Sequence, residues 1–443
     1  MIGSTAWAGK RFAVLGLARS GRATVDALVA SGAHVVAWDA DADKREAVVH
    51  AAQAQSLALD RVDLSIADPL TIDLTGFDGV VVSPGVPLNT HPIAAHARAV
   101  AVPVISDIEL FAQARAGLPP HLVVGITGTN GKSTTTALIH HILQTAGVPN
   151  TMGGNIGLPI LGQDALPAGG VYVLELSSYQ IDLTQSLDCD VAVLLNITPD
   201  HLDRYDGFDA YAASKARLFA MQSAGHAAII GIGDEASAAI ARTVTRGGRA
   251  EDVTKIAPGI CMDQSRWPAL QGPHNAQNAL AAIAACEALG VSREAIDAGL
   301  AGFGGLPHRT QIVGTVSGVR FVDDSKATNP ESVAPALRAF DRVHWILGGV
   351  AKSDNLDACR PGFGHVAAAY TIGEASPLFQ RLLSDAPFPV EPCSTIDVAV
   401  QRAFAAARPG ETVLLSPACA SFDQFSDYAA RGAAFVRAVE DLR

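Results

Sequence analysis

The sequence predicts an α/β protein with parallel sheets and three domains. Three successive blocks of the chain each alternate strand-like apolar runs with helix-like runs, a pattern typical of parallel sheets covered by helices. Glycine-rich turns follow the first strand of the first two blocks. With 443 residues, the chain is long enough for about three domains of ordinary size. We therefore expect domains over residues 1–110, 111–306 and 307–443.

The composition excludes several classes of function. The 32 basic and 44 acidic side chains give a net charge of −12, and no basic stretch indicates binding to nucleic acid or to a membrane surface. The six cysteines form no CxxC pair, which indicates reduced thiols rather than a disulfide framework. No signal peptide is evident, and no apolar run approaches the roughly 20 residues of a spanning helix. We expect a cytoplasmic monomer.

The first block contains candidate nucleotide-binding turns. An apolar run over 12–15 leads into Gly16-Leu17-Ala18-Arg19-Ser20-Gly21, which has the spacing of a dinucleotide fingerprint with alanine at its second glycine. Asp39 ends the next strand, where such folds hold a ribose hydroxyl. A third strand, 79–82, ends at Ser83-Pro84-Gly85. The pattern favours a nucleotide other than a nicotinamide cofactor, but that cofactor and a turn without any ligand stay open.

The run from Gly125 to Ser133 is the strongest functional signal. It joins an apolar strand, 122–124, to a helix-like run over 134–145. Small residues let successive N–H groups face one anion, and the start of the helix adds its positive dipole end. Lys132 can reach a terminal phosphate and Ser133 can hold Mg²⁺. Ile126 stands where the strict P-loop has glycine, so the run predicts a variant P-loop.

Two buried strands of the second block end in polar side chains. The run 171–174 ends in Glu175, and the run 191–195 ends in Asn196 and continues into a polar loop with His201. Ligands bind at the carboxyl ends of strands in open α/β sheets, and a carboxylate suits Mg²⁺. We expect a metal or substrate role for Glu175 and His201; the alternatives are a surface acid and a structural histidine.

The rest of the chain is less distinctive. Helix-like runs cover 209–221 and 274–289, and 302–307 has the glycines and proline of a linker. A hairpin is expected around Ser317-Gly318, with strands near 344–347 and 412–415. Lys215 is a solvated helix lysine from composition alone. Cys419 has no evident histidine partner, so we reject a thiol nucleophile.

Eight longer segments together identify a family. They are GITGTNGKSTTT at 125–136, GGNIG at 153–157, LELSSYQ at 174–180, NITPDHLDRY at 196–205, GPHNAQNAL at 272–280, GLPHR at 305–309, DDSKATNP at 323–330 and SPACASFDQF at 416–425. With them the whole chain resembles the Mur ligase family, and the last two point to its D-glutamate-adding members. The resemblance implies two Rossmann-like domains around a central P-loop sheet. It also implies an ATP-dependent amide ligase of peptidoglycan precursor synthesis, which joins D-glutamate to UDP-N-acetylmuramoyl-L-alanine through an acyl phosphate.

The resemblance also implies roles for individual residues. The ATP contacts would be Gly128, Thr129, Asn130, Gly131, Lys132, Ser133, Thr134, Asn275, Asn278, Arg309, Asp324 and Lys326. The Mg²⁺ ligands would be Ser133, Glu175, His201 and Lys215, the last as a carbamate. The contacts to the UDP substrate would be Gly16, Leu17, Ala18, Arg19, Ser20, Asp39, Ser83, Pro84, Gly85, Asn155 and His201. The D-glutamate contacts would be Thr328, Lys352, Ser421, Phe422 and Tyr428, and the catalytic set Lys132, Glu175, His201, Lys215 and Arg309.

Three other functions stay open at this point. A related Mur-type or folylpolyglutamate-type ligase would add a different amino acid. An oxidoreductase would rest on the first glycine turn alone, and a P-loop switch would bind ATP without ligation. Lys132 and Asp324 flank the linker yet are expected to meet one ATP, so we also expect hinge closure near 302–307.

Overall fold

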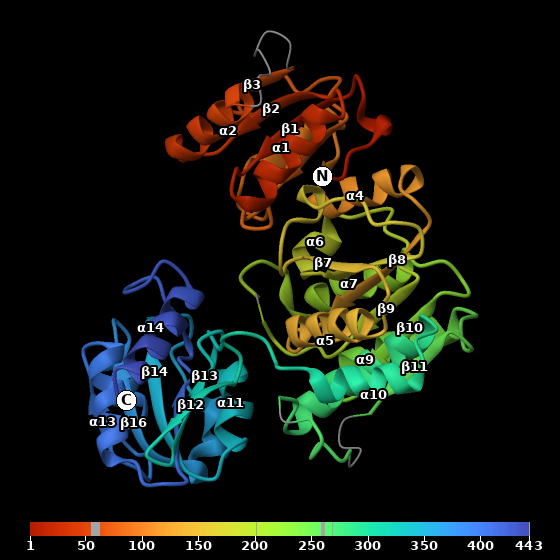
Figure 1. The fold of residues 1–443 in the computed structure, drawn as a ribbon. Helices are drawn as coiled ribbons and strands as arrows, with labels where there is room; N and C mark the ends of the chain where they lie inside the picture. The colour runs from red at the N-terminus through yellow and green to blue at the C-terminus, as the bar shows by residue number, and fades with distance from the viewer. Residues whose placement is uncertain (55–62, 201, 258–261, 268, 443) are drawn as a thin grey trace. The chain divides into compact units, whose positions relative to one another are not determined.

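The computed structural model describes residues 1–54, 63–200, 202–257, 262–267 and 269–442 (Figure 1). The chain divides into two compact units. Unit 1 contains Met1–Ile260 and Gln277–Leu300, and unit 2 contains Cys261–Ala276 and Ala301–Arg443. Each unit is built from mainly parallel sheets with helices, which confirms the predicted α/β class. The predicted division at 110/111 and 306/307 stays a prediction.

The first sheet of unit 1 has five parallel strands in the order β3-β2-β1-β4-β5. Successive residues of β1 point to opposite faces, so Phe12 and Val14 join one apolar cluster while Ala13 and Leu15 join another. Helices therefore cover both faces. The elements are β1 Arg11–Leu15, α1 Arg19–Ala30, β2 His34–Trp38, α2 Ala42–Ala54, β3 Leu64–Ile66, β4 Gly79–Val82, α3 Ile93–Ala99 and β5 Val104–Ile105, after a 3₁₀ turn at Thr5–Trp7.

The second sheet of unit 1 has six parallel strands in the order β11-β10-β9-β6-β8-β7. Its central strand β6 is buried from Val123 to Thr127 and leads directly into the predicted P-loop. The strands are β6 His121–Thr127, β7 Asn150–Gly154, β8 Gly170–Glu175, β9 Val191–Leu194, β10 Ala227–Gly231 and β11 Val253–Ile256. The helices are α5 Lys132–Thr145, α6 Ser178–Asp182, α7 Gly207–Ala220, α8 Glu235–Arg246, α9 Pro273–Ala288 and α10 Arg293–Gly302, with 3₁₀ turns at Arg115–Gly117 and Ile160–Gly162. The start of α9, up to Ala276, and the end of α10, from Ala301, belong to unit 2.

Helix α4, Asp107–Ala114, crosses the predicted boundary at residue 110. The N–H of Ser106, its N-cap residue, donates to the carbonyl of Leu183 at 3.0 Å. The Glu109 carboxylate accepts from the N–H groups of Gln185 and Ser186 at 2.7 and 3.0 Å. This helix is therefore bonded to residues of the second sheet's layer, and one apolar cluster runs through both sheets of unit 1.

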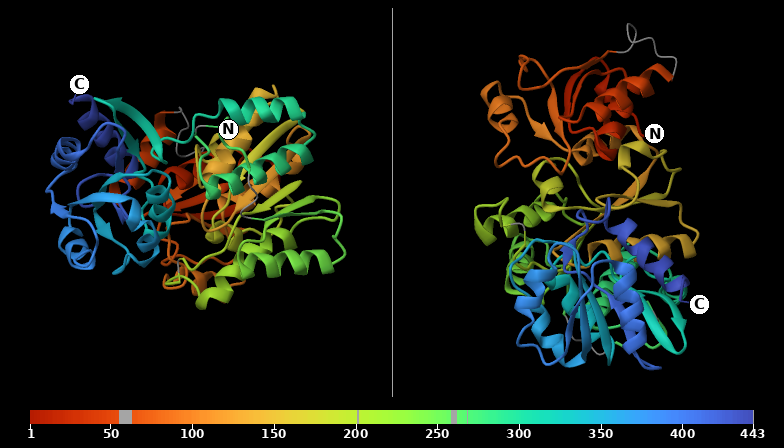
Figure 2. Two further views of the ribbon diagram at one scale, coloured as in Figure 1. Left: turned by 90° about the horizontal axis from the view of Figure 1, so that it is seen from below. Right: turned by 90° about the vertical axis from the view of Figure 1, so that its left-hand side faces the viewer.

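The third sheet lies in unit 2 and has the strand order β12-β13-β18-β14-β16-β17. The predicted hairpin is present: β12 and β13 pair antiparallel, and Ser317 and Gly318 have positive φ angles of 47° and 82°. Helix α11 lies on one side of this sheet and helices α13 and α14 lie on the other (Figure 1; further views in Figure 2). Helices α11 and α12 contribute to one core cluster, and α13 and α14 contribute to the other. The strands are β12 Gln311–Val316, β13 Val319–Asp323, β14 Val343–Gly348, β16 Val366–Ile372, β17 Val390–Pro392 and β18 Thr412–Leu415. The helices are α11 Pro330–Arg338, α12 Ser376–Leu382, α13 Ile396–Ala406 and α14 Tyr428–Glu440, with a 3₁₀ segment at Asp357–His365.

A two-stranded sheet completes unit 2. Strand β15, Val350–Ala351, pairs antiparallel with β19, Cys419–Ala420. This pairing places the segment after Gly349 beside the segment after Ala418, and both contain predicted D-glutamate contacts. Among the helices of the described residues, none is both long and apolar enough to span a membrane.

Candidate functional site

The P-loop connects β6 to α5 with the backbone that its glycines allow. Gly128 and Gly131 have φ angles of 149° and 89°, which side chains rarely adopt. A Cβ at Gly131 would also lie 2.3 Å from Asn278 Oδ1, so this position has no room for a side chain. Helix α5 begins at Lys132, two residues before the predicted start, because Gly131 is its N-cap. The loop thus presents a helix N-terminus suited to an anion.

Two lysines converge on one carbonyl of this loop. Lys132 Nζ donates to the carbonyls of Gly128 and Thr129 at 2.9 and 2.8 Å. Lys215 Nζ donates to the same Gly128 oxygen at 3.0 Å. Burial first, and then the positive charge of Lys132, lower the pKa of Lys215 well below its ordinary value. The composition-based reading of Lys215 as solvated is wrong, because its side chain is only 1% exposed.

Tyr211 orients Lys215 against the P-loop. The Lys215 nitrogen lies 4.5 Å from the centre of the Tyr211 ring, one helical turn earlier in α7. The Tyr211 hydroxyl is 3.1 Å from Thr129 Oγ1. Sequence reasoning missed Tyr211. Its spacing from Lys215 and from the buried Leu218, four and seven residues, could have placed all three on one buried face of the helix.

Asn196 fixes the conformation of the P-loop from the end of β9. Its carbonyl accepts from Thr129 N at 2.8 Å, and its Oδ1 accepts from Asn130 N at 2.9 Å. Its Nδ2 donates to the carbonyl of Asn130 at 3.0 Å. The sequence placed Asn196 at a strand end but assigned it no role. In the structure, Asn196 is one of the residues that join the loop after β9 to the P-loop.

The Glu175 carboxylate, at the end of β8, fits a divalent cation. Asn155 Nδ2 donates to Glu175 Oε1 at 3.0 Å, while Oε2 is buried without a hydrogen-bond partner among the described residues. Ser133, a predicted Mg²⁺ ligand, is buried at the start of α5. In the described parts of the chain, no group of three or more His, Cys, Asp or Glu side chains is arranged so that it could hold a metal ion. Mg²⁺ needs only one or two protein carboxylates when phosphate oxygens supply the rest, so Glu175 suits it.

The loop that contains His201 is described on both sides of that residue, but His201 itself lies outside the described residues. Thr198 N donates to Thr129 Oγ1 at 3.0 Å, so this loop touches the P-loop. On its other side, Arg204 donates to the carbonyl of Val86 at 2.9 Å and lies 4.4 Å over the ring of Tyr179. The segment after Ser83-Pro84-Gly85 is therefore bonded to the loop that follows β9, next to a pocket of about 120 Å³.

The first glycine turn is closed by Asp39 and Ser83. Asp39 Oδ2 accepts from Leu17 N at 2.7 Å, and Ser83 Oγ donates to the carbonyl of Gly16 at 2.8 Å. Burial raises the pKa of Asp39, but the N–H groups of Asp41 and Leu17 together with Lys44 outweigh it and lower the pKa. The other predicted contacts Ala18 and Ser20 lie in or next to the turn, and Arg19 donates to the carbonyl of Gly157 at 3.0 Å, two residues beyond Asn155.

In unit 2, two consecutive aspartates hold the segment around Arg309. His308 Nδ1 lies 2.6 Å from Asp323 Oδ2, and Thr310 N donates to Asp324 Oδ1 at 3.1 Å. His308 and Thr310 have positive φ angles of 62° and 44°, so Arg309 lies between two strained residues. Burial raises the pKa of Asp324 to about 7, although Ser416 and Thr310 donate to it. The roles of His308 and Asp323 were not predicted.

The remaining predicted ATP contacts are distributed over both units. Asn278 is buried in unit 1, and its Oδ1 accepts from Thr135 Oγ1 at 3.3 Å. Asn275, in unit 2, donates through Nδ2 to the carbonyl of Gln271 at 3.1 Å. Lys326 lies 3.9 Å over the ring of Tyr428, which links a predicted ATP contact to a predicted D-glutamate contact.

The predicted D-glutamate contacts lie around β15 and β19. Lys352 Nζ donates to Thr328 Oγ1 at 3.4 Å. Ser421 is buried directly after β19, whereas the next residue, Phe422, is 73% exposed. Cys419 is buried, and burial raises the pKa of its thiol to about 12, which agrees with rejecting it as a nucleophile.

Arg431 of α14 joins the segments around these contacts, and sequence reasoning missed it. Its guanidinium is 1% exposed and donates to Ser325 Oγ and O at 3.0 and 2.9 Å and to Cys419 O at 3.0 Å. It also donates to Gly348 O and Ala420 O, both at 3.3 Å. One buried cation thereby fixes the DDSKATNP segment, the end of β14 and strand β19.

Comparison with known proteins finds relatives over the whole length of this chain. The model of the Mur ligase middle domain matches residues 126–286, and that of the Mur ligase glutamate ligase domain matches residues 308–419. The UDP-N-acetylmuramoylalanine–D-glutamate ligase of Novosphingobium aromaticivorans is 60% identical over 442 residues, covering 100% of this chain and 97% of that protein. The protein of the same name from Sphingopyxis alaskensis is 61% identical over 447 residues and all of both chains. The crystal structure of UDP-N-acetylmuramate-alanine ligase MurC from Thermotoga maritima shares the fold, with a TM-score of 0.58, 16% identity and coverage of 98% and 100%.

Proposed function

Because the chain belongs to the Mur ligase family, we propose that it joins D-glutamate to UDP-N-acetylmuramoyl-L-alanine with consumption of ATP. The observation that supports this most is the similarity, over the full chain, to ligases named for this reaction. The product is a peptidoglycan precursor. Membership of this family does not support the two alternative functions, a nicotinamide oxidoreductase and a P-loop switch without ligation.

Chemically, the reaction must activate a carboxylate. The alanyl carboxylate attacks the γ-phosphorus of ATP, a C–O–P bond forms and ADP leaves. The amine of D-glutamate then attacks the acyl carbon, the amide bond forms, and inorganic phosphate leaves with the bonding electron pair. Phosphoryl transfer requires positioning and charge neutralisation. We assign these tasks to the P-loop, Lys132 and, from unit 2, Arg309.

The residues around Glu175 would hold Mg²⁺. Its unpartnered Oε2 and the hydroxyl of Ser133 are hard oxygen donors, and His201 is proposed as a further ligand. When bound, the ion would neutralise negative charge that develops on the phosphate oxygens. Asn155 would orient Glu175 through its amide, in addition to the substrate contact that the family resemblance implies.

We propose that Lys215 acts as a carbamate. Its lowered pKa favours the neutral amine, which is the form that reacts with CO₂. A C–N bond forms between the amine and CO₂, the nitrogen loses a proton, and the side chain then ends in an anionic carbamate whose oxygens can bind a metal. This reaction would explain why a lysine is buried in a metal site.

The UDP substrate, ATP and D-glutamate would each be held by separate segments of the chain. We assign the UDP part to the turn Gly16–Ser20, Asp39 and Ser83–Gly85, and ATP to the P-loop with Asn275, Asn278, Asp324 and Lys326. D-Glutamate has two carboxylates and needs cations and donors, which Lys352, Thr328 and Ser421 supply, with Phe422 and Tyr428 beside them. We further propose a cytoplasmic location, because ATP is supplied in the cytoplasm, and a monomeric enzyme.

The test is ADP release with UDP-N-acetylmuramoyl-L-alanine, ATP and Mg²⁺ against a panel of amino acids. We expect release with D-glutamate and not with L-alanine, L-lysine or meso-diaminopimelate. Lys132→Ala is expected to lose on the order of 10²–10³ in rate. Lys255→Ala, an exposed lysine of β11, is the control. Release with another amino acid instead would assign the chain to a different member of the family.

A further inference from the structure

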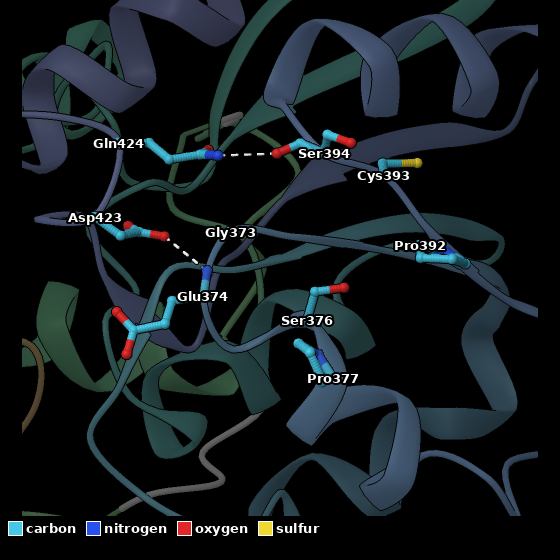
Figure 3. Close-up of a pocket in the computed structure, with 9 residues that line it drawn as sticks. All are labelled: Gly373, Glu374, Ser376, Pro377, Pro392, Cys393, Ser394, Asp423 and Gln424. Atoms are coloured by element: carbon cyan, nitrogen blue, oxygen red, sulfur yellow. Dashed lines mark hydrogen bonds between the residues drawn. The ribbon is translucent and has the colours of Figure 1, made fainter.

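Two side chains in the segment after β19 form hydrogen bonds to neighbouring turns, and neither residue has a role in the proposed function. This segment, Ser421 to Phe425, is here named the 421–425 loop. Asp423 Oδ2 accepts from Glu374 N at 2.9 Å, and Gln424 Nε2 donates to the carbonyl of Ser394 at 2.8 Å (Figure 3). Both bonds cross to turns that follow β16 and β17, at the rim of a pocket of about 430 Å³.

The turn that receives Asp423 is shaped for this contact. Gly373 has a φ angle of 66°, and a Cβ there would lie 2.2 Å from Asp423 Oδ2. The approach of the carboxylate to the backbone therefore requires glycine. The same turn is fixed to the chain before β15, because Ala375 N donates to the carbonyl of Gly349 at 2.8 Å. Lys352 follows only three residues after Gly349.

Other restraints act at the two ends of the 421–425 loop, and at its last residue the partly buried Phe425 packs against the core cluster to which α13 and α14 contribute. Its start is set by the pairing of β19 with β15. Inside the loop, the carbonyl of Ser421 accepts from Gln424 N and Phe425 N at 3.2 and 2.9 Å, which curls the loop but does not attach it to the sheet. Asp423 and Gln424 supply the side-chain hydrogen bonds that attach the middle of the loop to neighbouring turns. In the sequence, the exposed Phe422 stands between the buried Ser421 and Asp423.

We infer that Asp423 and Gln424 are positioning residues for D-glutamate: they fix the orientation of Ser421 and Phe422 relative to Lys352. This inference rests on the proposed function of those three residues. Asp423 acts as a hydrogen-bond acceptor in this role, and its charge is not needed. A side chain that keeps the acceptor and loses the charge should therefore replace it.

The test compares Asp423→Ala with Asp423→Asn in the full-length enzyme. For Asp423→Ala we expect KM for D-glutamate to rise by up to about tenfold, as for loss of one intramolecular hydrogen bond, with KM for ATP unchanged. Asp423→Asn should stay within about twofold of the wild type, because the amide oxygen still accepts from Glu374 N. Asp397→Asn removes an exposed carboxylate of α13 outside the loop and is the control for charge.

A second measurement separates this inference from the proposed function. Hydrogen exchange of the peptide over 419–427, without substrates, should be faster in Asp423→Ala and unchanged in Asp423→Asn. If the wild type does not use D-glutamate, the proposed function fails while the exchange result still decides whether the loop is anchored. If Asp423→Ala does not fold, Gln424→Ala should show the same rise in KM and in exchange. Equal defects in Asp423→Asn and Asp423→Ala, or wild-type behaviour of Asp423→Ala, would overturn the inference.

Discussion

Replacing Arg431 by methionine should destabilise unit 2 by about 4 kcal/mol. The guanidinium makes five hydrogen bonds to four residues, and a hydrogen bond to a charged group contributes at least about 1.5 kcal/mol. Five such bonds sum to roughly 7–8 kcal/mol. Burial lowers the pKa of Arg431 from 12.5 to about 10, which at about 1.4 kcal/mol per unit is a cost of roughly 3 kcal/mol for keeping the charge inside. The bonds outweigh that cost.

The assay is hydrogen exchange of the β18 and β19 peptides at increasing urea, which reports unfolding of unit 2 by itself. Methionine keeps the apolar stem of the side chain, so the loss measures the bonds rather than a cavity. Arg437→Met lies on the exposed face of the same helix and should change stability by less than about 0.5 kcal/mol. A loss below about 1 kcal/mol for Arg431→Met would refute the reasoning, because the desolvation cost would then cancel the bonds.

Three further predictions concern the site itself. Lys215→Ala should abolish ADP release, and acetate or formate should restore part of it by supplying the missing carboxylate; full activity without them would contradict the carbamate. Asp324, whose pKa is raised by burial to about 7 against 3.8 in the unfolded chain, keeps a proton that the unfolded chain loses, so stability should fall between about pH 4 and 7. The free energy of unfolding should fall by up to about 4 kcal/mol over this pH range. The urea midpoints of the wild type and Asp324→Asn should therefore diverge between about pH 4 and 7. Midpoints that change in parallel with pH would contradict this prediction. Asn155→Ala should weaken Mn²⁺ binding by about tenfold, because Glu175 loses the amide that orients its carboxylate. Electron paramagnetic resonance measures the Mn²⁺ affinity. An unchanged affinity would show that the Glu175 carboxylate is oriented without Asn155.

The parts that sequence reasoning found are those that local backbone chemistry dictates. Gly128 and Gly131 are required by their φ angles, and Ser317-Gly318 forms the hairpin turn for the same reason. The parallel sheets followed from apolar runs that are buried on both faces. Glu175 was found because it ends such a run. The α/β class is confirmed by the mainly parallel sheets and by the shared fold of the structural relatives, while the three domain boundaries stay a prediction.

The parts that it missed depend on contacts between distant segments. Arg431 bonds to Ser325, 106 positions away, and no local pattern distinguishes it from Arg437 on the same helix. Asn196 and the P-loop are 66 positions apart. Lys215 was read as solvated because periodicity arguments treat a lysine as polar. Only its place on the buried face with Tyr211 and Leu218 argues otherwise.

The carbonyl of Gly128 brings two lysines together at the P-loop, where one would suffice for phosphate binding. Burial and the nearby charge of Lys132 both disfavour the ammonium form of Lys215 and lower its pKa well below the ordinary value. The same proximity favours a negative charge at that position once the amine has reacted with CO₂, because Lys132 is then an opposite charge at short range. The arrangement thus disfavours two cations and favours a cation beside an anion. The geometry of the P-loop is therefore compatible with the carbamate that the family resemblance implies and that we propose.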